Sequence, residues 1–165
     1  VIPFSKLLLI GPDHTDGHFQ KYVFEKGLAE HVLLLGWRDD IPRLLNSSDV
    51  YVASSKSEGL GLNLIEAMAC NLPVVAFKNR GHCEVICHNK NGFLIEQNDY
   101  EEMAKYIIVL HKNQKIRNRI TAQAQEDICK YEIRNVLKEL ELIYNKMNER
   151  DSNSKRNDKD IIFNP

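Results

Sequence analysis

Residues 50–77 read VYVASSKSEGLGLNLIEAMACNLPVVAF, a stretch from which the fold class can be inferred. Two apolar runs, Val50–Ala53 and Pro73–Phe77, are bounded by turn-forming residues, a pattern typical of buried strands. Between them come a loop with two glycines and a segment, 63–70, that we expect to be a helix. A strand, a helix and a second strand in this order are typical of a parallel βαβ unit.

The same alternation continues on both sides of this unit. Further buried strands are expected at 6–10, 32–35 and 93–95. Helices are expected at 19–28, 40–45 (with an Asp cap), 82–86, 100–110 and 116–147, the last with a break near Lys130. This order predicts an α/β fold, a Rossmann-like doubly wound parallel sheet with helices on both faces. Residues 148–165 are polar without an apolar period, so we expect a domain over 1–147 and a mobile tail.

The composition is that of a soluble globular domain, with 27% charged and 43% hydrophobic residues. Lys and Arg number 22 and Asp and Glu 23, a balance that argues against a general nucleic-acid binder. No apolar run approaches the length of a bilayer span, and the start lacks the features of a signal peptide. The four cysteines lie in periodic apolar segments without a zinc spacing. We therefore expect a cytoplasmic protein with free thiols and no metal site.

The loop before the helix 63–70 is the strongest candidate for a ligand site. In an open α/β sheet, ligands bind beyond the carboxyl ends of the strands. Gly59 and Gly61 allow close approach of the backbone, and the helix start presents free N–H groups and the positive end of its dipole. These features favour a phosphate. A local alternative stays open: Asn63 and Glu66 have the spacing of a capping box, in which Glu66 only caps the helix.

Seven residues separate Glu58 from Glu66, and this segment closely resembles the E-x7-E segment of retaining GT-B glycosyltransferases of family 4, the group 1 family. Further matching segments follow in the family's order: Leu9–Gly11, Leu35–Pro42, Asp49–Val52, Arg80–Ile86 and Asn91–Leu94. The last two resemble bacterial capsule and exopolysaccharide members. The resemblance covers residues 6–147 and implies the C-terminal, donor-binding domain of such an enzyme. It also implies a fragment that lacks its first strand and its N-terminal acceptor domain.

The resemblance implies a role for each matching residue. Glu66 would bind the ribose hydroxyls, and Glu58, the residue carried over as catalytic, would contact hydroxyls of the transferred sugar. Trp37 and Arg38 would lie beside the nucleobase, although a half-buried aromatic and a solvated charge are the alternatives. The amides of the glycine loop would meet the sugar and the distal phosphate. The whole donor-binding set is Glu66, Gly59, Leu60, Gly61, Leu62, Asn63, Gly11, Trp37 and Arg38.

The implied reaction transfers a sugar from a nucleoside diphosphate sugar, with UDP preferred, to a glycan or lipid-linked acceptor in polysaccharide biosynthesis. No cofactor and no metal are expected, because an Asp-x-Asp motif is missing and a helix N-terminus can stabilise the leaving diphosphate. The full enzyme would be active, while this chain alone would not turn over. Peripheral attachment of the full enzyme to the inner face of the membrane stays open.

Two alternatives to a transferase remain at this point. One is a sugar-nucleotide epimerase of the same GT-B architecture, and the other is a non-catalytic interaction module that retains the fold. The E-x7-E spacing favours the transferase over the epimerase, and the intact Glu58, Glu66 and glycines argue against the non-catalytic module.

Overall fold

The computed structural model describes residues 2–13 and 16–157 and confirms the alternation of strands and helices. The elements are β1 (Leu7–Ile10), α1 (His18–Glu25), β2 (Val32–Gly36), α2 (Ile41–Asn46), β3 (Tyr51–Ala53), α3 (Leu62–Ala69), β4 (Val74–Phe77), α4 (Arg80–Val85), β5 (Phe93–Ile95), α5 (Tyr100–Lys112), α6 (Gln114–Ile128), a 3₁₀ turn (Cys129–Tyr131) and α7 (Ile133–Asn157). All four cysteines are free thiols, as expected.

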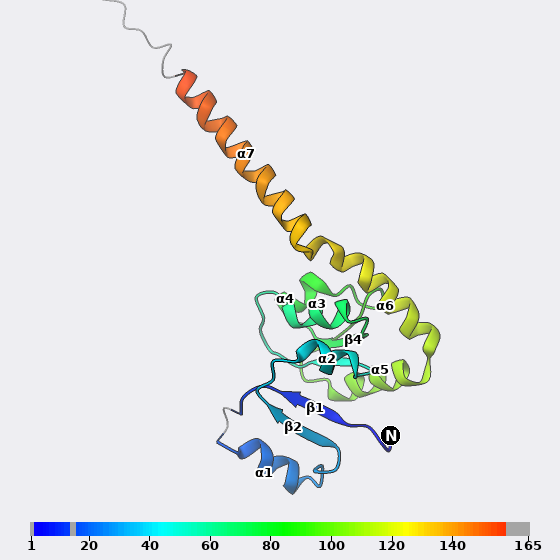
Figure 1. The fold of residues 1–165 in the computed structure, drawn as a ribbon. Coiled ribbons are helices and arrows are strands. Elements are labelled where there is room, and N and C mark those ends of the chain that lie inside the picture. Colours follow the sequence, from blue (N-terminus) through cyan, green and yellow to red (C-terminus); the bar gives the residue numbers. More distant parts are fainter. Residues whose placement is uncertain (1, 14–15, 158–165) are drawn as a thin grey trace, which may run out of the picture.

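All strand pairings are parallel, which confirms the α/β class. β1 pairs with β2, while β3, β4 and β5 form a second sheet in that order. The sequence predicted one sheet, but among the described residues no ladder joins β1 or β2 to β3. Figure 1 shows β1, β2 and α1 lying together on one side of the larger unit. The order of elements along the chain does not determine which strands share hydrogen bonds, because that depends on how the layers pack.

The larger sheet is packed on both faces, as a doubly wound sheet should be. Because neighbouring residues of a strand point to opposite faces, β4 sends Val74 and Ala76 into one core and Val75 and Phe77 into the other. Helix α3 packs on the first face and α5 on the second, and α6 contributes to both cores. This three-layer unit carries the loops that follow β3 and β4.

A buried asparagine ties α6 to the loop before β5. Asn91, which is 2% exposed, donates to the Val85 carbonyl at 3.2 Å and to Asp127 Oδ2 on α6 at 2.8 Å. Its Oδ1 accepts a hydrogen bond from the Cys87 N–H at 2.8 Å. The side chain therefore satisfies backbone groups that would otherwise be buried without partners.

Replacement of Asn91 with alanine is expected to lower the free energy of unfolding by about 1–3 kcal/mol, because two backbone groups lose their partner. Urea denaturation of the wild type and the variant measures this loss. Asn118→Ala on the exposed surface of α6 is the control and should change stability little. An equally small change for both variants would contradict the structural role of Asn91.

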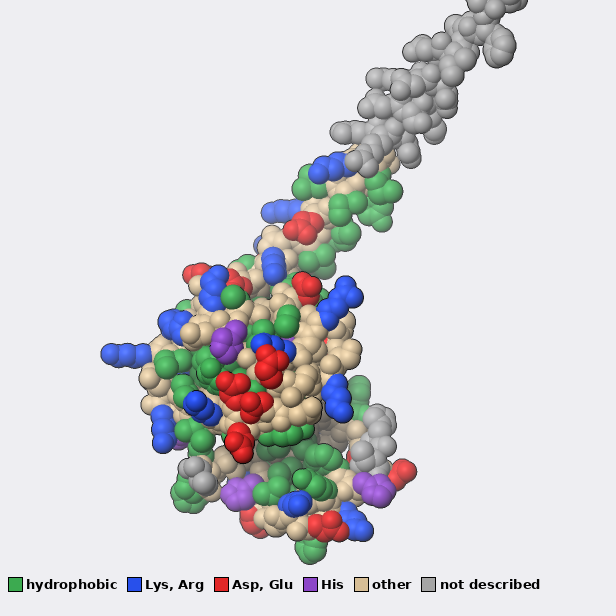
Figure 2. All heavy atoms as spheres, turned by 180° about the vertical axis from the view of Figure 1, so that it is seen from behind, with side chains coloured by type: hydrophobic (Ala, Val, Ile, Leu, Met, Phe, Trp, Pro, Cys, Tyr) green, Lys and Arg blue, Asp and Glu red, His purple; other side chains and the backbone are tan. Residues whose placement is uncertain are grey.

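The last helix extends away from the body (Figure 1). It follows the 3₁₀ turn Cys129–Tyr131, which confirms the break expected near Lys130. Apolar side chains lie exposed along it (Figure 2): Ile133, Val136, Leu137, Leu140, Leu142, Ile143, Tyr144 and Met147. Their spacing of three or four residues places most of them on one face. α7 also continues through 148–157, inside the segment expected to be a mobile tail, and the remaining residues, 158–165, lie outside the described part.

Candidate functional site

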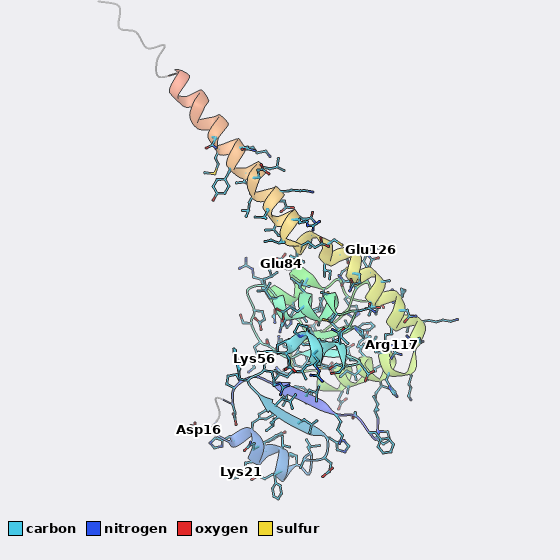
Figure 3. The ribbon with its side chains drawn as sticks, viewed as in Figure 1. Asp16, Lys21, Lys56, Glu84, Arg117 and Glu126 are labelled. Atoms are coloured by element: carbon cyan, nitrogen blue, oxygen red, sulfur yellow. The ribbon has the colours of Figure 1, made fainter. Side chains whose placement is uncertain are left out.

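The loop between β3 and α3, residues 54–61, lies where ligands bind in open α/β sheets, beyond the carboxyl end of a strand. Figure 3 marks it with Lys56. The segment after β4 holds this loop in place. Asn79 Nδ2 donates to the Ser55 carbonyl at 2.9 Å, and the Gly81 N–H donates to the Glu58 carbonyl at 3.1 Å. The two strand ends are thus joined through backbone groups of the loop.

Gly81 permits this close approach because it has no side chain. A Cβ on Gly81 would lie 2.7 Å from the carbonyl oxygen of Glu58 and 2.9 Å from its Cβ. Such distances are too short for a normal contact, so any side chain at this position must displace the loop. From the sequence, Gly81 was noted only as part of the matching segment Arg80–Ile86, and this role was not predicted. The available signal was a glycine directly before the helix expected at 82–86.

Helix α3 begins at Leu62, one residue before the expected start, and Gly61 is its N-cap. No side chain caps the helix, so the capping box proposed for Asn63 and Glu66 is wrong. A capping box needs its first residue outside the helix, whereas Asn63 lies inside the first turn and accepts from the Leu64 N–H at 3.0 Å. Local spacing could not show this, because the start of the helix is set by the loop that precedes it.

Three backbone amides before α3 are unpaired. The N–H groups of Gly59, Leu60 and Gly61 donate to no group within the described residues. The Leu62 amide, which was expected to act with them, instead donates to the Leu60 carbonyl at 2.8 Å. Unpaired amides and the positive end of the α3 dipole together suit an anion.

Gly61 and Gly59 differ in the space around them. A Cβ on Gly61 would lie 2.8 Å from Leu64 Cδ1 and 3.4 Å from His82 Cδ2, while a Cβ on Gly59 would meet nothing within 4 Å. A side chain at position 61 would therefore have to displace the end of the buried Leu64 side chain. Gly59 faces open space, where a ligand can reach its backbone.

The two glutamates of the expected site share a neighbourhood with Tyr51. Burial raises the pKa of the Tyr51 phenol, the charges of Glu66 and Glu58 raise it further, and a hydrogen bond with the Asn63 side chain opposes the shift. Glu58 is half-buried and Glu66 is exposed, and neither carboxylate is hydrogen-bonded or ion-paired within the described part of the chain. Free carboxylates accept hydrogen bonds from paired hydroxyls. Tyr51 was not predicted as part of the site, because its place in an apolar strand carried no functional signal.

A second group of expected residues lies at the carboxyl end of the smaller sheet. The Gly11 N–H donates to the Gly36 carbonyl at 2.9 Å. Trp37 is 80% exposed, so the alternative of a half-buried aromatic is wrong, and its ring is open for stacking. Arg38 donates two hydrogen bonds to Asp40, at 2.8 and 2.7 Å, which raise the pKa of Arg38 and hold that of Asp40 below its ordinary value.

This ion pair corrects two expectations. Arg38 is not simply a solvated charge, and Asp40 sits at the N-cap of α2 without capping it through its carboxylate. The Asp40 carboxylate accepts both hydrogen bonds of the Arg38 guanidinium instead of bonding to the first amides of α2. No hydrogen bond or ion pair between described residues joins this group to the loop 54–61. That both groups bind one ligand therefore stays a prediction.

Comparison with known proteins identifies the family. Residues 3–127 match the model of the glycosyl transferases group 1. The chain belongs to this family of glycosyltransferases. The family resemblance inferred from the E-x7-E segment is thereby confirmed.

Solved structures give the same fold. The C-terminal domain of a group 1 glycosyl transferase (LpcC) from Francisella tularensis matches with a TM-score of 0.71 and 28% identity, over 80% of this chain and 72% of that one. HepE from Anabaena in complex with UDP matches with a TM-score of 0.77 and 26% identity, over 88% and 41%. HepE has also been solved in complex with UDP-glucose.

Among curated proteins, the Escherichia coli UDP-Gal:alpha-D-GlcNAc-diphosphoundecaprenol alpha-1,3-galactosyltransferase is 33% identical over 109 residues, which cover 66% of this chain and 28% of that protein. The chain spans 40% or less of the length of the first curated relatives that it matches. Among the residues that the structure describes, no helix has both the length and the apolar character to cross a bilayer.

Proposed function

We propose that this chain is the donor-binding domain of a retaining glycosyltransferase that takes its sugar from a UDP-sugar. The observation that carries the proposal is the loop and helix start at 58–66, where two unpaired carboxylates accompany three unpaired amides. A nucleoside diphosphate sugar presents hydroxyls, which need acceptors, and phosphates, which need donors. The complexes of HepE with UDP and with UDP-glucose support UDP as the nucleotide.

Each element of the segment has a task in this proposal. Glu66 accepts hydrogen bonds from the ribose hydroxyls, and Glu58 accepts them from hydroxyls of the transferred sugar. The amides of Gly59, Leu60 and Gly61 donate to the distal phosphate. Negative charge develops on the diphosphate as the bond to the sugar breaks, and these donors and the α3 dipole stabilise that charge. The arrangement requires no metal and no cofactor.

The acceptor is proposed to bind to an N-terminal domain outside these 165 residues. The exposed apolar face of α7 supports a contact with such a domain, because large apolar patches on soluble proteins usually mark an interface. The name of the E. coli relative includes a diphosphoundecaprenol-linked sugar, which supports a lipid-linked acceptor in polysaccharide biosynthesis. Such an acceptor is consistent with peripheral attachment of the full enzyme at the inner face of the membrane.

Isothermal titration calorimetry of the full-length protein with UDP, GDP and ADP tests the proposal. Selective binding of UDP is expected, with the same affinity in the presence of EDTA. A strong loss of affinity with EDTA would contradict the metal-free site, and no binding of any nucleotide would contradict the donor site. A product assay then separates transfer, which gives free UDP and a glycosylated acceptor, from epimerisation, which gives an altered UDP-sugar.

Trp37→Ala is expected to weaken UDP binding without changing stability. Stacking of a base on an aromatic ring contributes about 1–3 kcal/mol, and an 80% exposed side chain contributes little to the core. Phe24→Ala on α1 is the matched control, because that ring is 78% exposed and lies on a helix away from the strand ends. Equal UDP affinities of the two variants would contradict stacking of the base on Trp37.

A further inference from the structure

His82 is a fully buried polar side chain in the first turn of α4. Its Nδ1 lies 2.6 Å from the Phe77 carbonyl at the end of β4. A carbonyl only accepts hydrogen bonds, so Nδ1 donates to it, and Asn79 Nδ2, which lies 3.1 Å from the same Nδ1, directs its own hydrogen bond to the Ser55 carbonyl. The other ring nitrogen, Nε2, is buried and has no hydrogen-bond partner among the described residues.

Packing alone does not account for an imidazole at this position. A buried polar atom without a partner costs stability, and an apolar side chain of similar size would avoid that cost only by leaving the Phe77 carbonyl without its hydrogen bond to the ring. Buried unsatisfied atoms are rare in native proteins and concentrate where function constrains the residue. The choice of histidine therefore points to a requirement beyond the core.

The ring lies between β4 and the start of α3. Its Cδ2 is 3.4 Å from the position that a Cβ on Gly61 would occupy, so the ring borders the N-cap of α3. The residue before it in the chain, Gly81, donates to the Glu58 carbonyl. Asn79, which caps α4 through the His82 N–H at 2.9 Å, donates to the Ser55 carbonyl. His82 thus sits at the centre of the contacts that hold the loop 54–61.

We propose that His82 is a positioning residue of the nucleotide-sugar site. Its ring, fixed by the bond to the Phe77 carbonyl, packs beside Gly61 and keeps the unpaired amides before α3 in the position from which they bind the diphosphate. The inference rests on the proposed function, because it assigns those amides to the diphosphate. His82 does not touch the ligand itself. It acts through the backbone of Gly61, where a displacement of a few tenths of an ångström weakens several hydrogen bonds together.

The test compares UDP affinity with stability in three variants of the full-length protein. His82→Ala removes both the ring and its N–H, whereas His82→Asn places an amide N–H close to the position of Nδ1. Asn91→Ala is the matched control, a buried polar residue (2% exposed) bonded to the C-terminal end of α4 and to α6 but not to the loop 54–61. Calorimetry gives the affinity for UDP, and urea denaturation gives the free energy of unfolding.

His82→Ala is expected to weaken UDP binding about tenfold or more, and His82→Asn, which keeps the N–H without the ring, to restore stability but little of the affinity. Asn91→Ala should lower stability by a similar amount and leave the affinity unchanged. The proposal is overturned if His82→Ala binds UDP like Asn91→Ala, or if His82→Asn, which lacks the ring, binds UDP like the wild type. In either case, UDP binding by the wild type and its loss in Glu66→Ala would leave the donor-site proposal standing, whereas no binding by the wild type would overturn both.

Discussion

Gly81→Ala is expected to weaken UDP binding by about tenfold or more, and to lower the free energy of unfolding by about 1–3 kcal/mol. The new methyl group would lie 2.7 Å from the Glu58 carbonyl oxygen, and backbone cannot move aside as the end of a flexible side chain can. The loop must shift, which breaks the hydrogen bond from the Gly81 N–H and displaces the amides before α3. Calorimetry with UDP and urea denaturation measure the two effects.

Gly92→Ala is the matched control for this prediction. Its Cβ would lie 2.6 Å from Val74 Cγ2, an equally close contact in a buried position next to β5. We expect the control to lose stability and to keep its affinity for UDP. If both variants lose affinity to the same extent, the effect is general destabilisation and not the displacement of the loop.

Glu66→Ala is expected to reduce the affinity for UDP by about 1–3 kcal/mol, because the ribose hydroxyls lose their acceptor. Stability should change little, since the Glu66 carboxylate is exposed and makes no hydrogen bond or ion pair within the described residues. The structure sharpens this prediction because the helix does not use Glu66 as a cap. An effect on binding therefore cannot arise from the loss of a capping box.

Glu126→Ala provides the control for the loss of charge. Glu126 is exposed in the last turn of α6, near the start of α7 and away from the loop 54–61 (Figure 3). Calorimetric titration of both variants with UDP, and with uridine as a ligand without phosphate, locates the lost contact. Weaker binding of both ligands to Glu66→Ala places the contact at the nucleoside. Unchanged binding of UDP to Glu66→Ala would show that Glu66 does not contact the nucleotide.

Much of the candidate site could be predicted because its residues are contiguous. Glu58, Gly59, Gly61 and Glu66 lie within one strand–loop–helix unit, so their approximate places follow once the strand and helix are recognised. What could not be predicted depends on contacts between separate segments. Tyr51 in β3 is buried with its phenol near Glu66 and Glu58, and Asn79 and Gly81, which follow β4, bond to the loop 54–61.

The sequence by itself determined the α/β class, the parallel strands and the family. Apolar runs of strand length that alternate with helices leave few other folds, and a segment such as Glu58–Glu66 keeps its spacing in any conformation. Only the tertiary structure decided that the strands form two sheets, that Gly61 is the N-cap of α3, and that Asn79 and Gly81 hold the loop 54–61. These features depend on how side chains and backbone groups from β3, β4 and α4 pack together. Because these segments are separate in the sequence, no local pattern predicts their contacts.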